Sequence, residues 1–174
     1  MPWRSIGLWI GFQAVWFTCA LGAARGISAP GIVGGMALTA VVVATSRHRG
    51  TDAAIAIVSA VTGLVVESVL QGAGFVTFAA PWPSPAFAPA WIVALWLAFG
   101  TTLPPLAAAL GERPSVAALL GAIAGPLAYI AGERLGALQL PASPLLVMTV
   151  LAGAWAIALP LLLAIYGRLA ARDG

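Results

Sequence analysis

Long apolar runs, separated by short polar or proline-rich breaks, dominate the pattern along this chain. A helix needs about 20 mostly apolar residues to cross a bilayer, and six runs reach or approach that length. They cover residues 6–24, 30–45, 53–71, 90–110, 116–132 and 144–166. The fourth run closes on Pro104 and Pro105, which we expect to kink or end its helix. We predict an all-α polytopic membrane protein, with one transmembrane domain over residues 1–174 folded as a compact bundle of six helices.

Composition supports this class. The chain has 174 residues, of which 61% are hydrophobic and only 7% charged, whereas soluble domains carry about 25% charged residues. Its net charge of +3 comes from arginine, since lysine is absent. The longest basic cluster, residues 47–49, is too small for a nucleic-acid surface, so we expect no nucleic-acid partner. Cys19 and His48 are each the only residue of their type, and we expect no metal and no cofactor.

Arginine positions predict the orientation, since cytoplasmic loops carry an excess of positive charge. With both termini in the cytoplasm, the inside receives Arg4, Arg47, Arg49, Arg113, Arg168 and Arg172. Only Arg25 and Arg134 then lie outside, together with the uncharged loop that holds Trp82. The first apolar run is longer than the core of a signal peptide, about 7–15 residues, so we expect it to remain as a helix. The predicted location is the bacterial inner membrane, multi-pass, with both termini inside.

One carboxylate, Glu67, interrupts the third apolar run. Ser59, Gly63 and Gln71 are spaced from it in steps of four, so these residues share one helix face. An ionisable residue inside a membrane costs about 2.5–3.5 kcal/mol on insertion scales, and it usually has a partner or a function. We therefore expect this face to point into the bundle and not at lipid.

Three explanations for Glu67 remain open in the sequence. The first is a structural ion pair with Arg25 or Arg134. The second is a place in a ligand-binding or reaction site. The third is a neutral carboxyl group that hydrogen-bonds to Gln13 or Gln71.

The fifth apolar run repeats the four-residue spacing. Gly121, Gly125, Tyr129 and Glu133 lie on one face in chain order, so small residues lead to a phenol and a carboxylate. In the predicted topology Glu67, Tyr129 and Glu133 approach the outer surface at a similar depth, and so do the two outside arginines. This convergence predicts a polar pocket that opens toward the outer leaflet.

That pocket is the candidate site. Its catalytic candidates are Glu67, Glu133 and Tyr129, since positioned carboxyl and phenol groups can transfer protons. Trp82 and Trp91 are expected at its rim. The candidate ligand-binding residues are Gln13, Trp16, Arg25, Gln71, Trp82, Trp91, Trp96 and Arg134.

Six fragments of the sequence resemble a known family. They are FQAVWF (12–17), LGAARG (21–26), ES-x-L-x-x-x-G (67–74), APWP (80–83), PAWIVALWLAFGTTL (89–103) and GPLAYIAGERLGAL (125–138). Together they are similar, over nearly the whole chain, to a bacterial inner-membrane family catalogued as domain of unknown function 2878. Its members are short polytopic proteins without an assigned reaction, and their genes often lie near genes for fatty-acid or cyclopropane-type lipid modification. The resemblance implies a lipid-linked role in the envelope and an acidic residue, commonly Asp, at the position of Glu67.

Serine-hydrolase, zinc-protease, P-loop and dinucleotide-binding motifs are absent, which disfavours those classes. We favour a lipid-linked enzyme or accessory subunit that handles an acyl chain or another lipophilic substrate. The alternatives are a small solute-binding or transport module and a noncatalytic scaffold of an envelope complex. Expected partners are membrane lipids, with a membrane protein as a further possibility. A lateral opening that ends at Glu67 or Glu133 favours the lipid-linked function, an aqueous path favours transport, and a sealed interior favours the scaffold.

Overall fold

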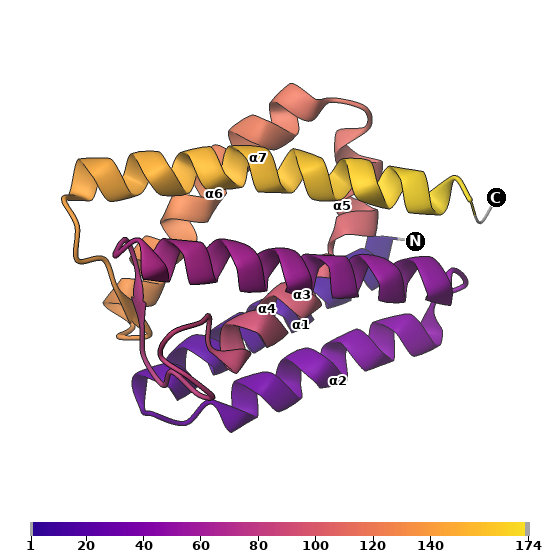
Figure 1. Cartoon of the computed structure of the whole chain (residues 1–174). Helices are drawn as coiled ribbons and strands as arrows, with labels where there is room; N and C mark the ends of the chain where they lie inside the picture. Colours follow the sequence, from indigo (N-terminus) through magenta and orange to yellow (C-terminus); the bar gives the residue numbers. More distant parts are fainter. Residues whose placement is uncertain (1, 173–174) are drawn as a thin grey trace.

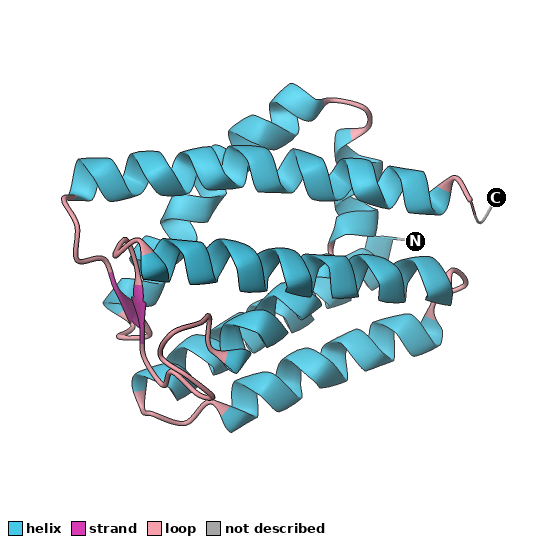
Figure 2. Ribbon diagram, viewed as in Figure 1, coloured by secondary structure: helices cyan, strands magenta, loops and turns pink. Residues whose placement is uncertain are grey.

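The computed structural model describes residues 2–172, and their regular structure is almost wholly helical (Figures 1 and 2). The helices are α1 Pro2–Ala24, α2 Ala29–Thr45, α3 Arg49–Gly72, α4 Ala90–Gly100, α5 Leu103–Leu110, α6 Pro114–Arg134 and α7 Pro144–Ala170. Two short strands, β1 Thr77–Phe78 and β2 Leu138–Gln139, pair antiparallel. The predicted all-α class is confirmed.

Four of these helices, α1, α3, α6 and α7, are long and apolar enough to cross a membrane. α4 and α5 pass the same test only as a pair, which bends by 46° at the break between them. α2 is apolar, but its 17 residues fall short of the roughly 20 that a span needs. Residues 2–172 thus contain four candidate spans, or five with the bent pair, as a multi-pass membrane protein has. The count of six spans stays a prediction.

The break between α4 and α5 has a local cause. Pro104 and Pro105 lie in the first turn of α5, where an α-helix leaves its backbone N–H groups unpaired in any case. Just before them, the hydroxyls of Thr101 and Thr102 donate to carbonyls in the last turn of α4, each at 2.7 Å. The prediction that the two prolines kink or end this helix is confirmed.

α1, α3 and α6 run toward one end of the bundle, and α2, α4 and α7 run back (Figure 1). α1 packs against α2 and α4, α3 packs against α4 and α7, and α6 packs against α7. The start of α1 and the end of α7 therefore lie at the same end. Residues 73–89 and 135–143, with the strand pair, lie at the opposite end, which we call the loop end (Figure 2).

The loop end is closed by packed side chains. Val76 and Phe78 are buried in the hydrophobic core, and β1 joins them through its pairing to the segment that follows α6. The Trp91 indole N–H donates to the carbonyl of Ala79 at 3.0 Å, and the rings of Phe78 and Trp91 meet edge-on at a centroid distance of 5.8 Å. Because residues 73–89 are tied to α4 in this way, they cover the end of the bundle toward which α3 and α6 lead.

Candidate functional site

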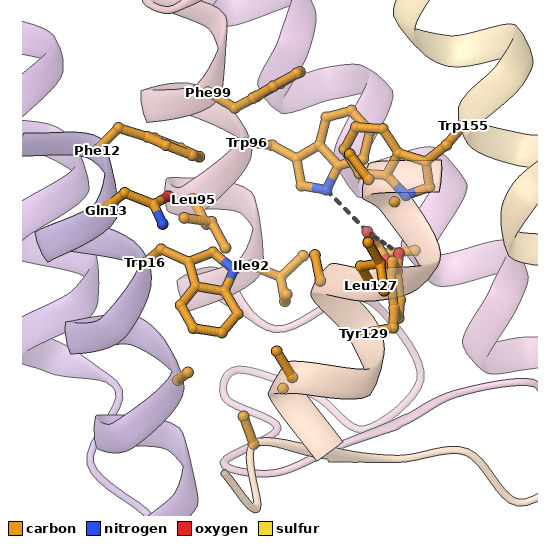
Figure 3. A pocket seen from close by; sticks show the side chains of 18 of the residues that line it. Phe12, Gln13, Trp16, Ile92, Leu95, Trp96, Phe99, Leu127, Tyr129 and Trp155 are labelled. Atoms are coloured by element: carbon orange, nitrogen blue, oxygen red, sulfur yellow. Dashed lines mark hydrogen bonds between the residues drawn. The ribbon is translucent and has the colours of Figure 1, made fainter. Parts of the chain in front are cut away.

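The polar centre of the bundle is the Glu67 carboxylate. Its side chain is only 2% exposed, and it accepts hydrogen bonds from residues on two other helices. The Trp96 indole N–H donates to Oε1 at 2.9 Å, while the Tyr129 hydroxyl lies 2.6 Å from Oε1 and 2.7 Å from Oε2 (Figure 3). We call Glu67, Trp96 and Tyr129 the carboxylate cluster. It joins α3, α4 and α6 through neutral donors.

These bonds exclude the partners that the first and third explanations name for Glu67. In the described part of the chain no arginine forms an ion pair with it, and both Arg25 and Arg134 are exposed. Neither Gln13 nor Gln71 hydrogen-bonds to it. The buried carboxylate therefore accepts from an indole and a phenol. The indole belongs to α4, a helix that the sequence did not pair with α3.

Two glycines make room for the aromatic rings of the site. A Cβ atom added at Gly63, one turn before Glu67, would lie 2.1 Å from Cγ of Trp96. A Cβ atom added at Gly125, one turn before Tyr129, would lie 2.3 Å from Cγ of Trp155. Both distances are far below van der Waals contact, so each ring lies directly on a glycine. Small residues at helix interfaces serve this purpose in membrane bundles.

The two indoles that rest on these glycines stack on each other. The rings of Trp96 and Trp155 have centroids 4.8 Å apart and are inclined by 19°. Phe99 meets both rings edge-on, at 5.9 Å from Trp96 and 5.6 Å from Trp155. Trp155 Nε1 is buried and faces the Tyr129 hydroxyl, but it makes no well-aligned hydrogen bond within the described residues. The stack forms an aromatic wall beside the carboxylate cluster (Figure 3).

A cavity of about 610 Å³ adjoins the carboxylate cluster. Its lining is mostly apolar and comes from α1, α4 and α6, with contributions from α3, α5, β2 and α7. The polar side chains on this lining are Glu67, Tyr129 and Gln13, together with the tryptophan indoles. Figure 3 shows Gln13 and Trp16 of α1 on one side of the cavity and Tyr129 on the other.

The cavity opens sideways between α1 and α6. Four of its lining residues are large, apolar and exposed: Trp9 at 38%, Phe17 at 48%, Leu120 at 39% and Leu127 at 58%. The first two belong to α1 and the others to α6, and these two helices pack chiefly on other neighbours. At the loop end the cavity is bounded by the buried residues Ala137 and Leu138. The opening thus lies between two helices that are candidate membrane spans.

The structure divides the candidate residues into two groups. Those that line the cavity are Gln13, Trp16, Glu67, Trp91, Trp96 and Tyr129. Those that do not line it are Arg25, Gln71, Trp82, Glu133 and Arg134. The expected pocket therefore differs from the observed one, which is mostly apolar and opens between helices. Trp82 is 62% exposed in the loop, whereas Trp91 is buried.

Gln71 and Glu133 instead hold the loop end together. The Gln71 side-chain amide donates to the carbonyls of Pro85 and Phe87, at 2.6 and 3.2 Å. Glu133 Oε1 accepts the backbone N–H of Leu140 at 2.9 Å. Both polar groups thus satisfy backbone atoms of loops, because each lies in the last turn of its helix.

Trp155 lies deep in the last apolar run, which predicts a place in the core or on the pocket, but it is not among the candidate residues named from the sequence. The signal for it lies in α6, where a Cβ atom at Gly121 would come within 2.3 Å of the Trp155 carbonyl oxygen. Two glycines one turn apart let a neighbouring helix approach closely, as α7 does here at Trp155. Phe12, Phe99 and Leu127 carry no comparable signal, because their types are common on every face of these helices.

Comparison with known proteins gives one result. A family model described as "Protein of unknown function (DUF2878)" matches residues 5–161. No curated protein and no solved structure matches the chain. The matched range contains the whole carboxylate cluster and every residue that lines the cavity.

Proposed function

The chain belongs to the DUF2878 family, whose description assigns no activity, and we propose from the site itself that it handles a lipophilic molecule in the bacterial inner membrane. It acts as an enzyme or as an accessory subunit of one. The observation that carries the proposal is the apolar cavity between α1 and α6, which opens sideways and ends at Glu67.

The size and lining of the cavity support a lipophilic ligand. Its volume of about 610 Å³ lies within the range of about 300–1,000 Å³ that small-molecule sites occupy. A ligand that enters from the bilayer meets apolar groups first, because Phe17 and Leu127 lie at the opening. Glu67 and Tyr129 provide the carboxylate and the phenol on the lining, and Gln13 is its other polar side chain besides the indoles. A long apolar body with one polar head matches this order.

The carboxylate cluster supplies the chemistry that such a site needs. Tyr129 and Glu67 share a short hydrogen bond, so a proton can move between them and a bound head group. Their rotation is restricted, because Trp96 donates to the same carboxylate and rests on Gly63. Fixed groups of this kind suit either proton transfer or the orientation of a head group.

The alternatives have weaker support. A polar solute would find few partners, since the lining is mostly apolar and Gln13 is its only amide side chain. A noncatalytic scaffold requires no cavity, although the buried and hydrogen-bonded Glu67 would suit it. The lipid-linked function therefore remains our conclusion, with lipids as its partners and no nucleic acid.

We also propose six spans with both termini in the cytoplasm. α2 and the bent pair α4–α5 would then be short and kinked spans, beside the four long helices. Six arginine positions lie at the end of the bundle that holds the termini, against Arg25 and Arg134 at the loop end.

Labelling with a membrane-impermeant maleimide tests this orientation, with Cys19→Ala as the background. It should label Ala86→Cys in intact spheroplasts and His48→Cys only after lysis, and the opposite pattern would reverse the orientation.

Lipid analysis of a deletion strain tests the function. We expect an altered lipid profile that the wild-type chain restores, and that Glu67→Gln fails to restore. Glu133→Gln is the matched control, because this carboxylate is exposed and lies outside the cavity. Leu127→Trp, from an exposed position at the opening, should also impair restoration without loss of folded protein. An unchanged profile in the deletion strain would refute the proposal.

A further inference from the structure

The closed end of the cavity carries a negative group with no positive group to balance it. Among the described residues its lining holds one carboxylate, Glu67, and no lysine, arginine or histidine. A phosphate or carboxylate head group would lie beside Glu67 in apolar surroundings with no cation to offset the repulsion. This composition disfavours ligands with anionic head groups.

One oxygen of Glu67 retains the capacity to accept a hydrogen bond. Oε1 receives the Trp96 N–H and lies within reach of the Tyr129 hydroxyl. Oε2 has only the Tyr129 hydroxyl as a partner, and that group has a single proton to share between the two oxygens. A carboxylate has about four lone-pair sites, so Oε2 can accept from a ligand as well.

A donor in the same place is only weakly paired. The buried Trp155 N–H faces the Tyr129 hydroxyl oxygen (Figure 3), but no well-aligned hydrogen bond joins it to this or another described acceptor, and such a group destabilises a structure unless something pairs with it fully. The ring that carries it lines the cavity and stacks on Trp96, whose own N–H points to Glu67. In Figure 3 the Trp155 nitrogen lies on the side of the ring that faces the Tyr129 hydroxyl.

We propose that the head group recognised here is a hydroxyl, so that the ligand is a long-chain alcohol or another uncharged hydroxylated lipid. The inference rests on the proposed function and names its substrate class. A hydroxyl donates to Glu67 Oε2 and accepts from Trp155 Nε1, because it carries a donor and acceptors on one atom. An ammonium would be attracted to the Glu67 carboxylate, but it has donors only and cannot accept from the indole N–H, while a carboxylate has acceptors only and would be repelled by Glu67.

Photolabelling with matched probes tests the proposal. The full chain is placed in vesicles of phosphatidylethanolamine and phosphatidylglycerol. Diazirine analogues of hexadecanol, hexadecanoic acid, hexadecylamine and hexadecane are then compared at equal membrane concentration. We expect the alcohol to label peptides of α1, α4 and α6 at the cavity about tenfold more than the acid or the amine, the effect of one well-placed hydrogen bond.

Two variants separate recognition of the head group from integrity of the cavity. Trp155→Phe keeps an aromatic ring on Gly125 but removes the N–H, so the preference for the alcohol should fall to about threefold or less, while hexadecane labelling stays unchanged. Trp82→Phe, in the exposed loop, should leave both unchanged.

The outcomes distinguish the two proposals. Labelling of the cavity by none of the four probes would refute the proposed function, and with it this inference. Labelling by the acid or amine as strong as by the alcohol would overturn the hydroxyl assignment and leave a lipophile site standing. An unchanged preference in Trp155→Phe would also overturn the assignment, because the weakly paired indole N–H is the group that distinguishes a hydroxyl from an ammonium.

Discussion

α3 and α6 share one pattern of two polar residues, and in both helices the first and the second of these residues have different surroundings. Each helix has a glycine, then a polar residue one turn later, then a second polar residue after another turn. The inner residues, Glu67 and Tyr129, are buried and bond to each other. The outer residues, Gln71 and Glu133, leave the interior and bond to loop backbone. Equal spacing along the sequence therefore leads to two different roles.

The difference follows from helix geometry. Four residues exceed one turn of 3.6 residues, so each step of four rotates a position by about 40° around the axis. After two steps the second polar residue has left the buried face. A position seven residues after the glycine lies within about 20° of it around the axis, and the buried residues Leu70 in α3 and Gly132 in α6 occupy this position. Inner and outer residues should respond differently to substitution.

Loss of the inner carboxylate should have the largest effect. Glu67→Ala leaves the N–H of Trp96 and the hydroxyl of Tyr129 without their acceptor in a buried site, which we expect to destabilise the fold by about 3 kcal/mol. The matched Glu133→Ala should cost less than about 1 kcal/mol, since water can replace an exposed acceptor. Unfolding in detergent measures both, and equal losses would remove the distinction between inner and outer carboxylates.

Substitution of the glycines that precede the inner residues should have the second-largest effect on stability. Gly63→Ala places a methyl group 2.1 Å from Cγ of Trp96, and overpacking of this kind costs about 1–3 kcal/mol. Gly72→Ala, at the end of the same helix, has no neighbouring atom within 4 Å and should be close to neutral. Gly125→Ala and Gly153→Ala form the same pair on α6 and α7. A stable Gly63→Ala would show that Trp96 can move without loss.

Coupling between the inner residues should be measurable and smaller. A double-mutant cycle of Glu67→Gln and Tyr129→Phe should give an interaction of about 1 kcal/mol, because the two side chains share a hydrogen bond. The cycle of Tyr129→Phe with Gln71→Ala should give about zero, since these residues share no partner. Coupling of similar size in both cycles would mean that inner and outer residues act as one network.

The outer residues should show the smallest effect, confined to the loop. Gln71→Ala removes two hydrogen bonds to residues 85 and 87, with a cost of about 1 kcal/mol or less. Hydrogen exchange of residues 81–88 should become faster, while exchange in α6 around Tyr129 should not change. Faster exchange around Tyr129 would indicate that the loop supports the carboxylate cluster directly.

Much of the fold was open to prediction. The apolar runs predicted where helices lie, and Pro104 and Pro105 predicted the break between α4 and α5, because proline excludes a continuing helix. The buried position of Glu67 follows from the cost of placing a carboxyl group in lipid. The polar pocket at the loop end was not found, because depth along the chain ignores rotation around each helix.

The hydrogen-bond partners of Glu67 could be predicted only in part. The spacing in α6 predicted Tyr129 at the depth of Glu67, but not the hydrogen bond that joins them across 62 residues. Trp96 lies 29 residues away, and nothing local shows that its N–H bonds to Glu67. The Trp155 ring lies in the site only because Gly125 leaves room for it. Pairings of this kind depend on how helices rotate and approach one another.

The sequence by itself determined the class of protein, the positions of the helices and the burial of one carboxyl group, since hydrophobicity and proline act locally. Only the tertiary structure decided that Glu67 meets an indole and a phenol instead of an arginine, and that its cavity opens between α1 and α6. The physical reason is that helix packing in a membrane depends on the fit of side chains across interfaces, while the lipid treats the apolar faces of a helix alike.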